Sequence, residues 1–228
     1  MRLHFIGTQH SDIYGRERLR RALDIERPDA LGIESSQELF DYIRSAEYKN
    51  NKFKILKKLK RYGASKDYLH LIQKKFFEFD NYELFIPQEY SKIHTIPLFP
   101  VDDPKHVEFV KKSFSEERDG ITRESVKEQN SLCYSLPLQN PYENMQDAVA
   151  LGPESETDLA CVNLEFLNTS SDRETIAAGN IRTLLCSGSY ENIVVVYGAG
   201  HTLRDKYKLT LLSKLEDLQP TRKLLCDY

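Results

Sequence analysis

The residues Ile193-Val194-Val195-Val196-Tyr197 constrain the fold of this chain more than any other segment. The run is apolar and almost wholly β-branched, which is typical of a strand covered on both faces in the middle of a parallel sheet. Gly198-Ala199-Gly200-His201 follows it directly. A second apolar segment, Arg2 to Ile6, runs in the same way into Gly7-Thr8-Gln9-His10. We therefore predict an α/β fold with a mainly parallel central sheet flanked by helices.

A strand–helix–strand unit is expected at the start of the chain. Residues 12–26 carry apolar side chains at helical spacing, and Ala30-Leu31-Gly32-Ile33-Glu34 has the composition of a second strand. About 35 residues is the size of one right-handed crossover, so the first two strands are predicted to pair in parallel.

The middle of the chain is predicted to be mainly helical. A helical insertion is expected at about residues 36–92, after the second strand, followed by a third strand over residues 93–101 and a helix over residues 103–118. Residues 119–157 have weak periodicity and several prolines, and are predicted to form a loop or a loosely helical lid.

The C-terminal part is predicted to continue the α/β pattern. Ser171 and Glu174 have the spacing of a capping box, which places a helix start there. A helix is expected over residues 203–218 and a last strand over residues 223–226.

Composition indicates one globular domain, residues 1–228, with 40% hydrophobic and 29% charged residues. The net charge of −3 gives no overall attraction to nucleic acid or to anionic membranes. There is no apolar run of roughly 20 residues, and the N-terminus does not resemble a secretory signal, so we expect a cytoplasmic protein without a membrane span.

The four cysteines are expected to be reduced and mostly buried thiols. None of them is spaced as Cys-x-x-Cys, which disfavours zinc-knuckle and thioredoxin-like sites. They are Cys133, Cys161, Cys186 and Cys226.

Both Gly-x-x-His turns are candidates for chemistry, because ligands of parallel α/β sheets bind at the carboxyl ends of the strands. Gly7, Gly198 and Gly200 are candidate cofactor-binding positions, where a bare backbone turns sharply. If the two strands are neighbours, His10 and His201 face one crevice, where imidazoles can bind a metal or transfer protons. The alternative is that each histidine only caps a helix or bonds a turn.

Three charged residues are candidates to complete this site. Glu34 ends the second strand, where it can ligate a metal, act as a general base or pair with an arginine. Asp102 ends the third strand, although Asp102-Asp103-Pro104 is also a helix-capping sequence. Arg173 is placed to orient an anionic group. Two histidines with one or two carboxylates resemble a catalytic metal centre that keeps a position open for water.

Two other functions have weaker support. Gly198-Ala199-Gly200 lacks the third glycine of a dinucleotide fingerprint, because position 203 is Leu203. The segment Lys49–Lys75 is basic and interleaved with aromatic residues, which could bind RNA or DNA. The acidic balance of the whole chain favours instead a solvated helix pair whose aromatic side chains pack inward.

Two blocks resemble the TraB/PrgY family and its relatives, the Tiki proteins. The first runs from Phe5-Ile6-Gly7-Thr8-Gln9-His10-Ser11 to Arg27-Pro28-Asp29-Ala30-Leu31-Gly32-Ile33-Glu34. The second comprises Asp172-Arg173-Glu174-Thr175-Ile176-Ala177, Asn180-Ile181 and Val194-Val195-Val196-Tyr197-Gly198-Ala199-Gly200-His201. Together they cover about a third of the chain. Residues 36–159 show no such resemblance.

The resemblance implies a shared α/β core in which His10, Glu34, Arg173 and His201 meet in one cleft, with Asp102 as a further candidate. Tiki relatives are metal-dependent proteases that use manganese or cobalt. More distant relatives include erythromycin-esterase-like proteins and haem-binding ChaN-like proteins, and PrgY acts in pheromone shutdown. The membrane segments of several relatives have no counterpart here.

We therefore expect a metal-dependent hydrolase, with a peptidase favoured and a peptide or small molecule as substrate. His10, Glu34, Asp102 and His201 would hold manganese, cobalt, zinc or iron, and Glu34 and Arg173 would act in catalysis. The alternatives are a non-catalytic protein that sequesters a ligand or peptide, and nucleic-acid binding through residues 49–75.

Overall fold

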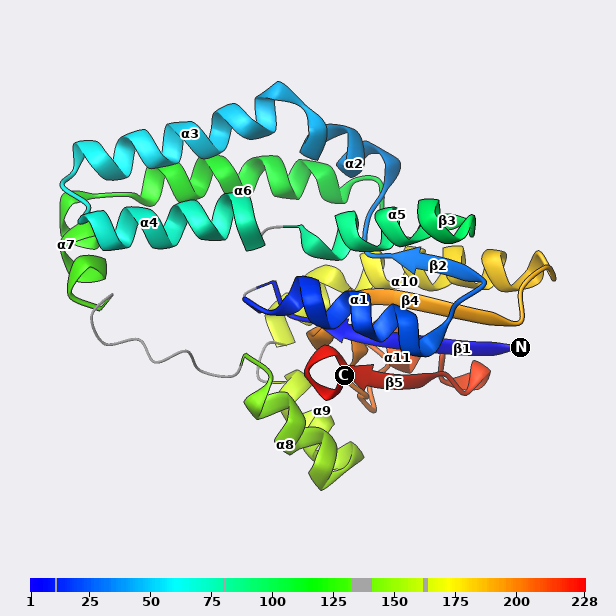
Figure 1. Cartoon of the computed structure of the whole chain (residues 1–228). Coiled ribbons are helices and arrows are strands. Elements are labelled where there is room, and N and C mark those ends of the chain that lie inside the picture. Colours follow the sequence, from blue (N-terminus) through cyan, green and yellow to red (C-terminus); the bar gives the residue numbers. More distant parts are fainter. Residues whose placement is uncertain (11, 80, 133–140, 162–163) are drawn as a thin grey trace. The chain divides into compact units, whose positions relative to one another are not determined.

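The computed structural model describes residues 1–228 except 11, 80, 133–140 and 162–163 (Figure 1). The chain divides into two compact units. Unit 1 comprises Met1–Ser35, Asn81–Asp103 and Asn140–Tyr228, and unit 2 comprises Ser36–Asp80 and Pro104–Gln139. The chain thus leaves unit 1 twice to build unit 2, once within the insertion expected at residues 36–92 and once within residues 104–139.

Unit 1 contains a five-stranded sheet in which every pair of neighbours is parallel, as the sequence predicts. The strand order is β3-β2-β4-β1-β5. The bounds are β1 Arg2–Thr8, β2 Ala30–Ile33, β3 Leu98–Pro100, β4 Asn192–Gly198 and β5 Thr221–Leu224. The β-branched run lies in β4, the central strand, where its side chains are covered on both faces.

The predicted pairing of the first two strands is wrong, because β4 lies between them. Ile6 of β1 and Ile33 of β2 both face Val196 of β4 in the register. The β1–α1–β2 crossover therefore skips one strand position, which the length of the connection does not reveal. Because β4 lies between β1 and β2, the two strands that precede the Gly-x-x-His turns, β1 and β4, are direct neighbours.

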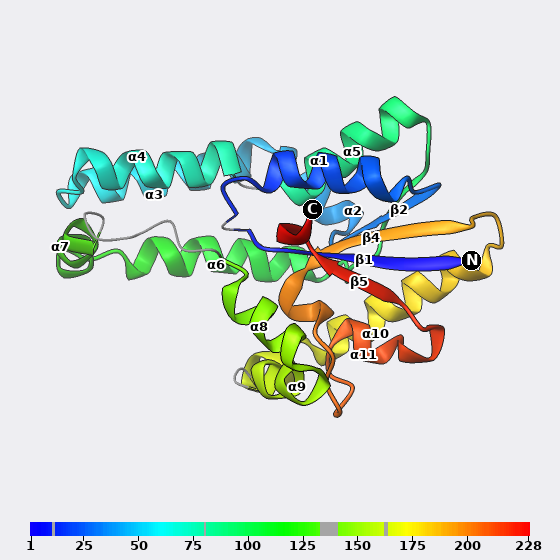
Figure 2. The same cartoon turned by 60° about the horizontal axis from the view of Figure 1, so that its bottom comes forward.

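Helices cover both faces of the sheet (Figure 2). Helices α1 (Gly15–Glu26) and α5 (Tyr82–His94) lie on one face, and α10 (Leu164–Cys186) and α11 (Leu211–Lys214) on the other. Alternate residues of the strands, such as Phe5, Val195 and Tyr197, pack with Ile181 of α10. Ala30 of β2 belongs to the same layer. Side chains alternate between the two faces of a strand, and Glu34 is four residues after Ala30, so Glu34 lies on the α10 side.

Several predicted elements differ from those of unit 1. The helix predicted over residues 203–218 is wrong, because the Asp205 carboxylate accepts the backbone N–H groups of Leu209 and Thr210 and folds that stretch into a compact loop. Only α11 and one 3₁₀ turn, η3 (Glu216–Leu218), are helical in that stretch, and a second 3₁₀ turn, η2 (Ala199–Thr202), precedes it. The helix start at Ser171 is also wrong, because α10 begins at Leu164 and no proline or glycine interrupts it near Ser171.

Two further boundaries move for local reasons. Helix α5 contains Pro87 and continues to His94, where Thr95 adopts a left-handed conformation, so β3 is shorter than predicted. The last strand, β5, begins at Thr221 rather than at Lys223, and η4 (Leu225–Asp227) follows it. Most of the described residues of 119–157 are helical, as in the second form of the predicted loop or loosely helical lid, and they lie in α7 (Arg123–Leu132), α8 (Glu143–Leu151) and α9 (Pro153–Cys161). Residues 133–140 lie outside the described residues.

Unit 2 is a helical bundle. Its elements are α2 (Gln37–Arg44), α3 (Ala46–Arg61), α4 (Lys66–Lys74), the π-helix η1 (Lys75–Phe79), α6 (His106–Gly120) and α7 (Arg123–Leu132). Serine hydroxyls at positions 36, 45 and 65 accept the amide N–H three residues later and so begin α2, α3 and α4. The core gathers Ile55, Leu56, Leu59, Phe76 and Val126.

No helix of the described residues is long and apolar enough to cross a membrane. Cys186 is exposed and Cys226 half-buried, and both are free thiols, so the expectation of mostly buried cysteines is wrong for Cys186. Cys133 lies outside the described residues.

Candidate functional site

Arg173 of α10 joins the two carboxylates that follow β2 and β3. Its Nε and Nη2 donate to Oδ1 and Oδ2 of Asp102, each at 2.7 Å, and Nη2 also donates to Oε1 of Glu34 at 2.5 Å. The three side chains are largely buried, and Asp102 is completely so. A guanidinium bound to two carboxylates in this way is held in one orientation, because its planar donors match the carboxylate fork.

Glu34 stays ionised at the end of β2. Burial alone would raise its pKa, but the charge of Arg173, with smaller contributions from His201, His10 and the Gly198 amide, lowers it to about 2. The Gly198 N–H donates to Oε2 of Glu34 at 2.5 Å. At neutral pH this carboxylate is therefore a fixed negative charge and a weak base.

His201 is held against a buried glutamate of α10. Its Nδ1 lies 2.5 Å from Oε1 of Glu174, which has no solvent exposure, and its Nε2 lies 3.9 Å from Oε1 of Glu34. Burial alone would lower the pKa of His201, but the hydrogen bond and charge of Glu174, with the charge of Glu34, raise it. The Oε2 atom of Glu174 has no hydrogen-bond partner among the described residues. The His201 ring therefore supplies a polar partner to a carboxylate that would be costly to bury alone.

His10 is oriented by a second buried glutamate. Its Nδ1 lies 2.8 Å from Oε1 of Glu83 on α5, and 76% of its side chain is exposed. The turn before it is clamped on both sides, because the Tyr82 hydroxyl donates to the Gln9 carbonyl and the Gln9 N–H donates to the Tyr142 hydroxyl. Both tyrosines are completely buried. The first Gly-x-x-His turn is therefore held in place, while the ring of His10 extends into solvent.

The second turn is fixed by an ion pair between α9 and β5. Arg222 binds both oxygens of Glu156 and donates to the Thr202 carbonyl at 2.8 Å, and Glu156 accepts the Arg204 N–H. These bonds reach the backbone just after His201 in η2. They restrain that backbone, while Glu174 holds the ring.

The three predicted glycines play different parts, and none uses a left-handed backbone. A Cβ at Gly198 would lie 3.0 Å from Oε2 of Glu34, and a Cβ at Gly7 would lie 2.8 Å from Oγ1 of Thr202. A Cβ at Gly200 would meet nothing within 4 Å. Close packing, and not the sharp turn predicted, is therefore what requires glycine at the first two positions.

The structure brings Glu34, Asp102, Arg173 and His201 together. His10 lies near enough for its charge to lower the pKa of Glu34. However, within the described part of the chain, no group of three or more His, Cys, Asp or Glu side chains lies close enough to hold a metal ion. Asp102 uses both oxygens on Arg173.

Glu174 and Glu83 are the functional residues that sequence reasoning missed. A signal for Glu174 exists, because it lies on the same helical face as Ala177, Ala178 and Ile181, which are buried in the core. A carboxylate on such a face needs a partner. No sequence signal connects Glu83 to His10, since 73 residues separate them.

No protein-family model, curated protein or solved structure matches this chain. The resemblance to the TraB/PrgY family therefore stays a prediction.

Proposed function

We propose that this protein is a hydrolase, with peptide bonds as its target, and that its centre comprises His201, Glu34, Arg173 and His10. One observation carries the proposal. The Gly-x-x-His turns leave neighbouring strands, and each histidine has its Nδ1 against a buried glutamate. This arrangement fixes the ring so that Nε2 is the reactive nitrogen.

The side chains suit the parts of a hydrolysis that need a proton donor and a fixed charge. Without a metal, His201, whose pKa Glu174 raises, would give a proton from Nε2 to the leaving amine as water adds to the carbonyl carbon and the C–N bond breaks, and the proton that the water loses would restore the imidazolium. With a metal bound, the same Nε2 would be a ligand instead. Glu34 would orient that water or a cation beside it. Because Arg173 is already bound to two carboxylates, its part is to position Glu34 rather than to clamp a substrate.

A divalent metal, either manganese, cobalt, zinc or iron, is part of the proposal. His10, His201 and Glu34 would hold it after moving closer together than they lie in this structure, and when bound it would supply an activated water. The donor chemistry fits, because histidines that ligate metals usually bind a carboxylate through the other ring nitrogen. Asp102 is left out of this set, since its side chain is completely buried and both of its oxygens bind Arg173, whereas 13% of the Glu34 side chain is exposed. Membership of the TraB/PrgY family belongs to the same proposal. So does a cytoplasmic location, which the two free thiols support.

A second candidate is a non-catalytic protein of the same fold that sequesters a peptide, haem or another small ligand. It is favoured by the state of the carboxylates, because each oxygen of Glu34 and Asp102 already accepts a hydrogen bond. A carboxylate with a pKa of about 2 is also too weakly basic to take a proton from water efficiently.

Elemental mass spectrometry of the purified protein, followed by a peptidase screen with each metal, tests the proposal. We expect near-stoichiometric metal and peptide cleavage in the wild type, and neither in the His10→Ala/His201→Ala variant. A His70→Ala/His94→Ala variant is the matched control, because both histidines are exposed and neither belongs to the proposed centre. Peptide cleavage without bound metal would refute the metal site and still support a hydrolase. Ligand retention without any cleavage would favour the second candidate.

A further inference from the structure

The α3–α4 hairpin of unit 2 carries a strong local excess of positive charge. Residues 49–75 contain ten Lys and Arg residues and one acidic residue, Asp67, although the whole chain has a net charge of −3. Charges on a protein surface are screened beyond about 10 Å at moderate salt. A ligand at this hairpin would therefore respond to the local charge more than to the net charge of the chain.

Two of these cations belong to the internal structure of the unit. The buried Lys52 ammonium donates to the Phe76 carbonyl at 2.6 Å, and the Lys58 ammonium donates to the Arg118 carbonyl at 2.6 Å. Both therefore tie α3 to its neighbours.

Other cations of α3 form an exposed row. Lys49, Lys57, Lys60 and Arg61 are exposed, and their spacing places them along one side of the helix together with Phe53. None of the four forms an ion pair with a carboxylate of the residues that the structure describes. On α6 of the same unit, by contrast, Lys111 pairs with Glu108, and Lys112 pairs with Glu116. With respect to the carboxylates that the structure describes, the α3 row therefore holds uncompensated charge.

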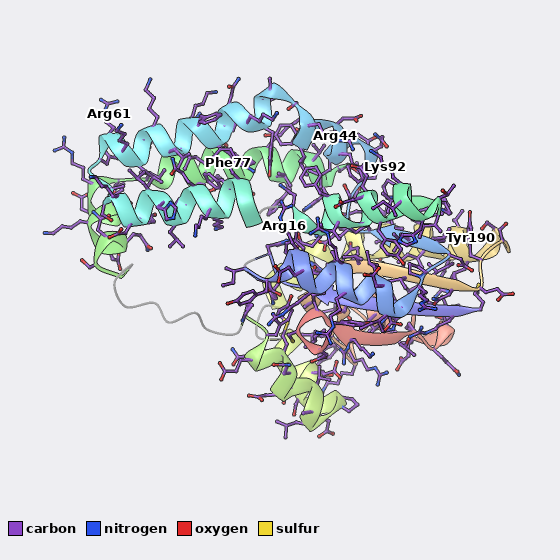
Figure 3. The ribbon with its side chains drawn as sticks, in the orientation of Figure 1. Arg16, Arg44, Arg61, Phe77, Lys92 and Tyr190 are labelled. Carbon is purple, nitrogen blue, oxygen red and sulfur yellow. The ribbon has the colours of Figure 1, made fainter. Side chains whose placement is uncertain are left out.

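Two aromatic rings are exposed beside this row. Phe53 is 58% exposed and Phe77 is 46% exposed, and their ring centroids lie 5.5 Å apart. The other aromatic residues of the segment, Tyr62, Tyr68 and Phe76, pack in the core of unit 2. Arg61 lies at the far end of α3, and Phe77 lies beyond the end of α4 (Figure 3). The exposure of two large apolar rings to water is unfavourable, and a ligand that stacks on the rings would remove that surface from water.

We propose that the exposed row of α3 and the Phe53–Phe77 pair bind single-stranded nucleic acid. Cations that follow a backbone, together with rings on which bases stack, are the features of sequence-tolerant single-strand sites. The row from Lys49 to Arg61 extends over about 18 Å of helix. That length matches about five stacked nucleotides at roughly 3.4 Å each.

Two other polyanions fit this surface less well. A duplex keeps its base faces stacked inside, so it cannot use the two phenylalanines. An anionic membrane requires a broad apolar helix face, and that face of α3, with Ile55, Leu56 and Leu59, is buried in the core.

Fluorescence anisotropy with labelled dT20 and rU20 tests the proposal, using the whole chain over a range of salt concentrations. A 20-base-pair duplex and phosphatidylserine vesicles serve as competitors. We expect the logarithm of the affinity for both single strands to fall linearly with the logarithm of the salt concentration. A Lys57→Gln/Lys60→Gln/Arg61→Gln variant should reduce that slope by about 2, because each phosphate that a cation neutralises on a single strand contributes about 0.7.

Two further variants separate stacking from charge. Phe53→Ala/Phe77→Ala should weaken binding at least tenfold and leave the salt slope unchanged. Lys111→Gln/Lys112→Gln/Lys127→Gln removes the same charge elsewhere in unit 2 and should leave binding almost unchanged. Circular dichroism checks that each variant is folded.

The proposal is overturned if no single strand binds at about 50 mM salt, or if the control lowers affinity as much as the α3 variant does. It is also overturned if the phenylalanine variant binds as well as the wild type, or if the duplex or the vesicles compete better than unlabelled single strands.

Discussion

Replacement of Arg173 by methionine tests the charge cluster at the centre of the candidate site. Methionine keeps much of the side-chain length but removes the cation that Glu34 and Asp102 share. Both carboxylates would then lie largely buried without their main partner. We expect a large loss of stability whether or not the protein is an enzyme, so this variant tests the structure separately from the function.

The size of the effect follows from Glu34. Its pKa of about 2, against an ordinary value of 4.5, corresponds to roughly 3 kcal/mol of stability at neutral pH. Of the groups that lower this pKa, Arg173 has the largest effect. Asp102 loses its partner as well, and the removal of one member of a buried ion pair costs about 3–5 kcal/mol. We therefore expect the free energy of unfolding of Arg173→Met to be lower by about 3–5 kcal/mol at pH 7.

The pH dependence has a defined sign. Because the pKa of Glu34 is lowered in the folded protein, its contribution is present above pH 4.5 and is lost as the pH falls towards 2. In the variant Glu34 can protonate on mild acidification, because the cation that lowers its pKa most is gone, and this relieves its burial. The difference between wild type and variant should therefore be largest at pH 7 and clearly smaller at pH 4.

Urea unfolding at pH 7 and pH 4 measures both quantities. Arg182→Met is the matched control on the same helix, since Arg182 pairs with Asp217 at the surface and should contribute less than about 1 kcal/mol. Adding Glu34→Gln and Asp102→Asn to Arg173→Met should restore part of the lost stability. A loss below about 1 kcal/mol at pH 7, or a loss that is equal at both pH values, would refute the reasoning.

Two other predictions concern packing and a second buried network. Gly198→Ala should lower the proposed activity at least tenfold, because its Cβ would lie 3.0 Å from Oε2 of Glu34, whereas Gly200→Ala, with nothing within 4 Å, should behave as wild type. Assays of both variants check this, and equal activity would contradict it. Burial lowers the pKa of His4 from 6.5 to about 4, so protons bind the unfolded chain before they bind the folded one. The free energy of unfolding should therefore decrease by up to about 3 kcal/mol as the pH falls from 6.5 to 4. Urea unfolding should show that the stability of His4→Gln does not decrease in this way. If the stabilities of the wild type and of His4→Gln changed with pH in parallel, a neutral His4 would be contradicted.

The architecture of the sheet could be predicted because its signals are local. The β-branched run of residues 193–197 can be stable only where both faces are covered, and it forms the central strand. The positions of Glu34 and Asp102 after their strands also follow from the sequence. Parallel strands bring their carboxyl ends to one edge, and side chains alternate between faces.

The errors have two kinds of cause, namely contacts between distant segments and local side-chain bonds that compete with the helix. The insertion of β4 between β1 and β2 leaves no mark on the length of their connection. The loop after Thr202 is folded by the carboxylate of Asp205, which outweighs a sequence of good helix formers. The core of unit 2 also joins two separate stretches of the chain, since it packs Phe76 with Val126.

The sequence by itself determined the parallel α/β core and the two Gly-x-x-His turns at the ends of strands, because hydrophobic pattern and glycine spacing are local properties. Only the tertiary structure decided what the charged side chains bind. Arg173 binds Glu34 and Asp102. Glu174 contacts His201, and Glu83 contacts His10. A buried charge requires a partner, but any of the many acidic residues could have supplied it, and only the folded chain selects which one lies within reach.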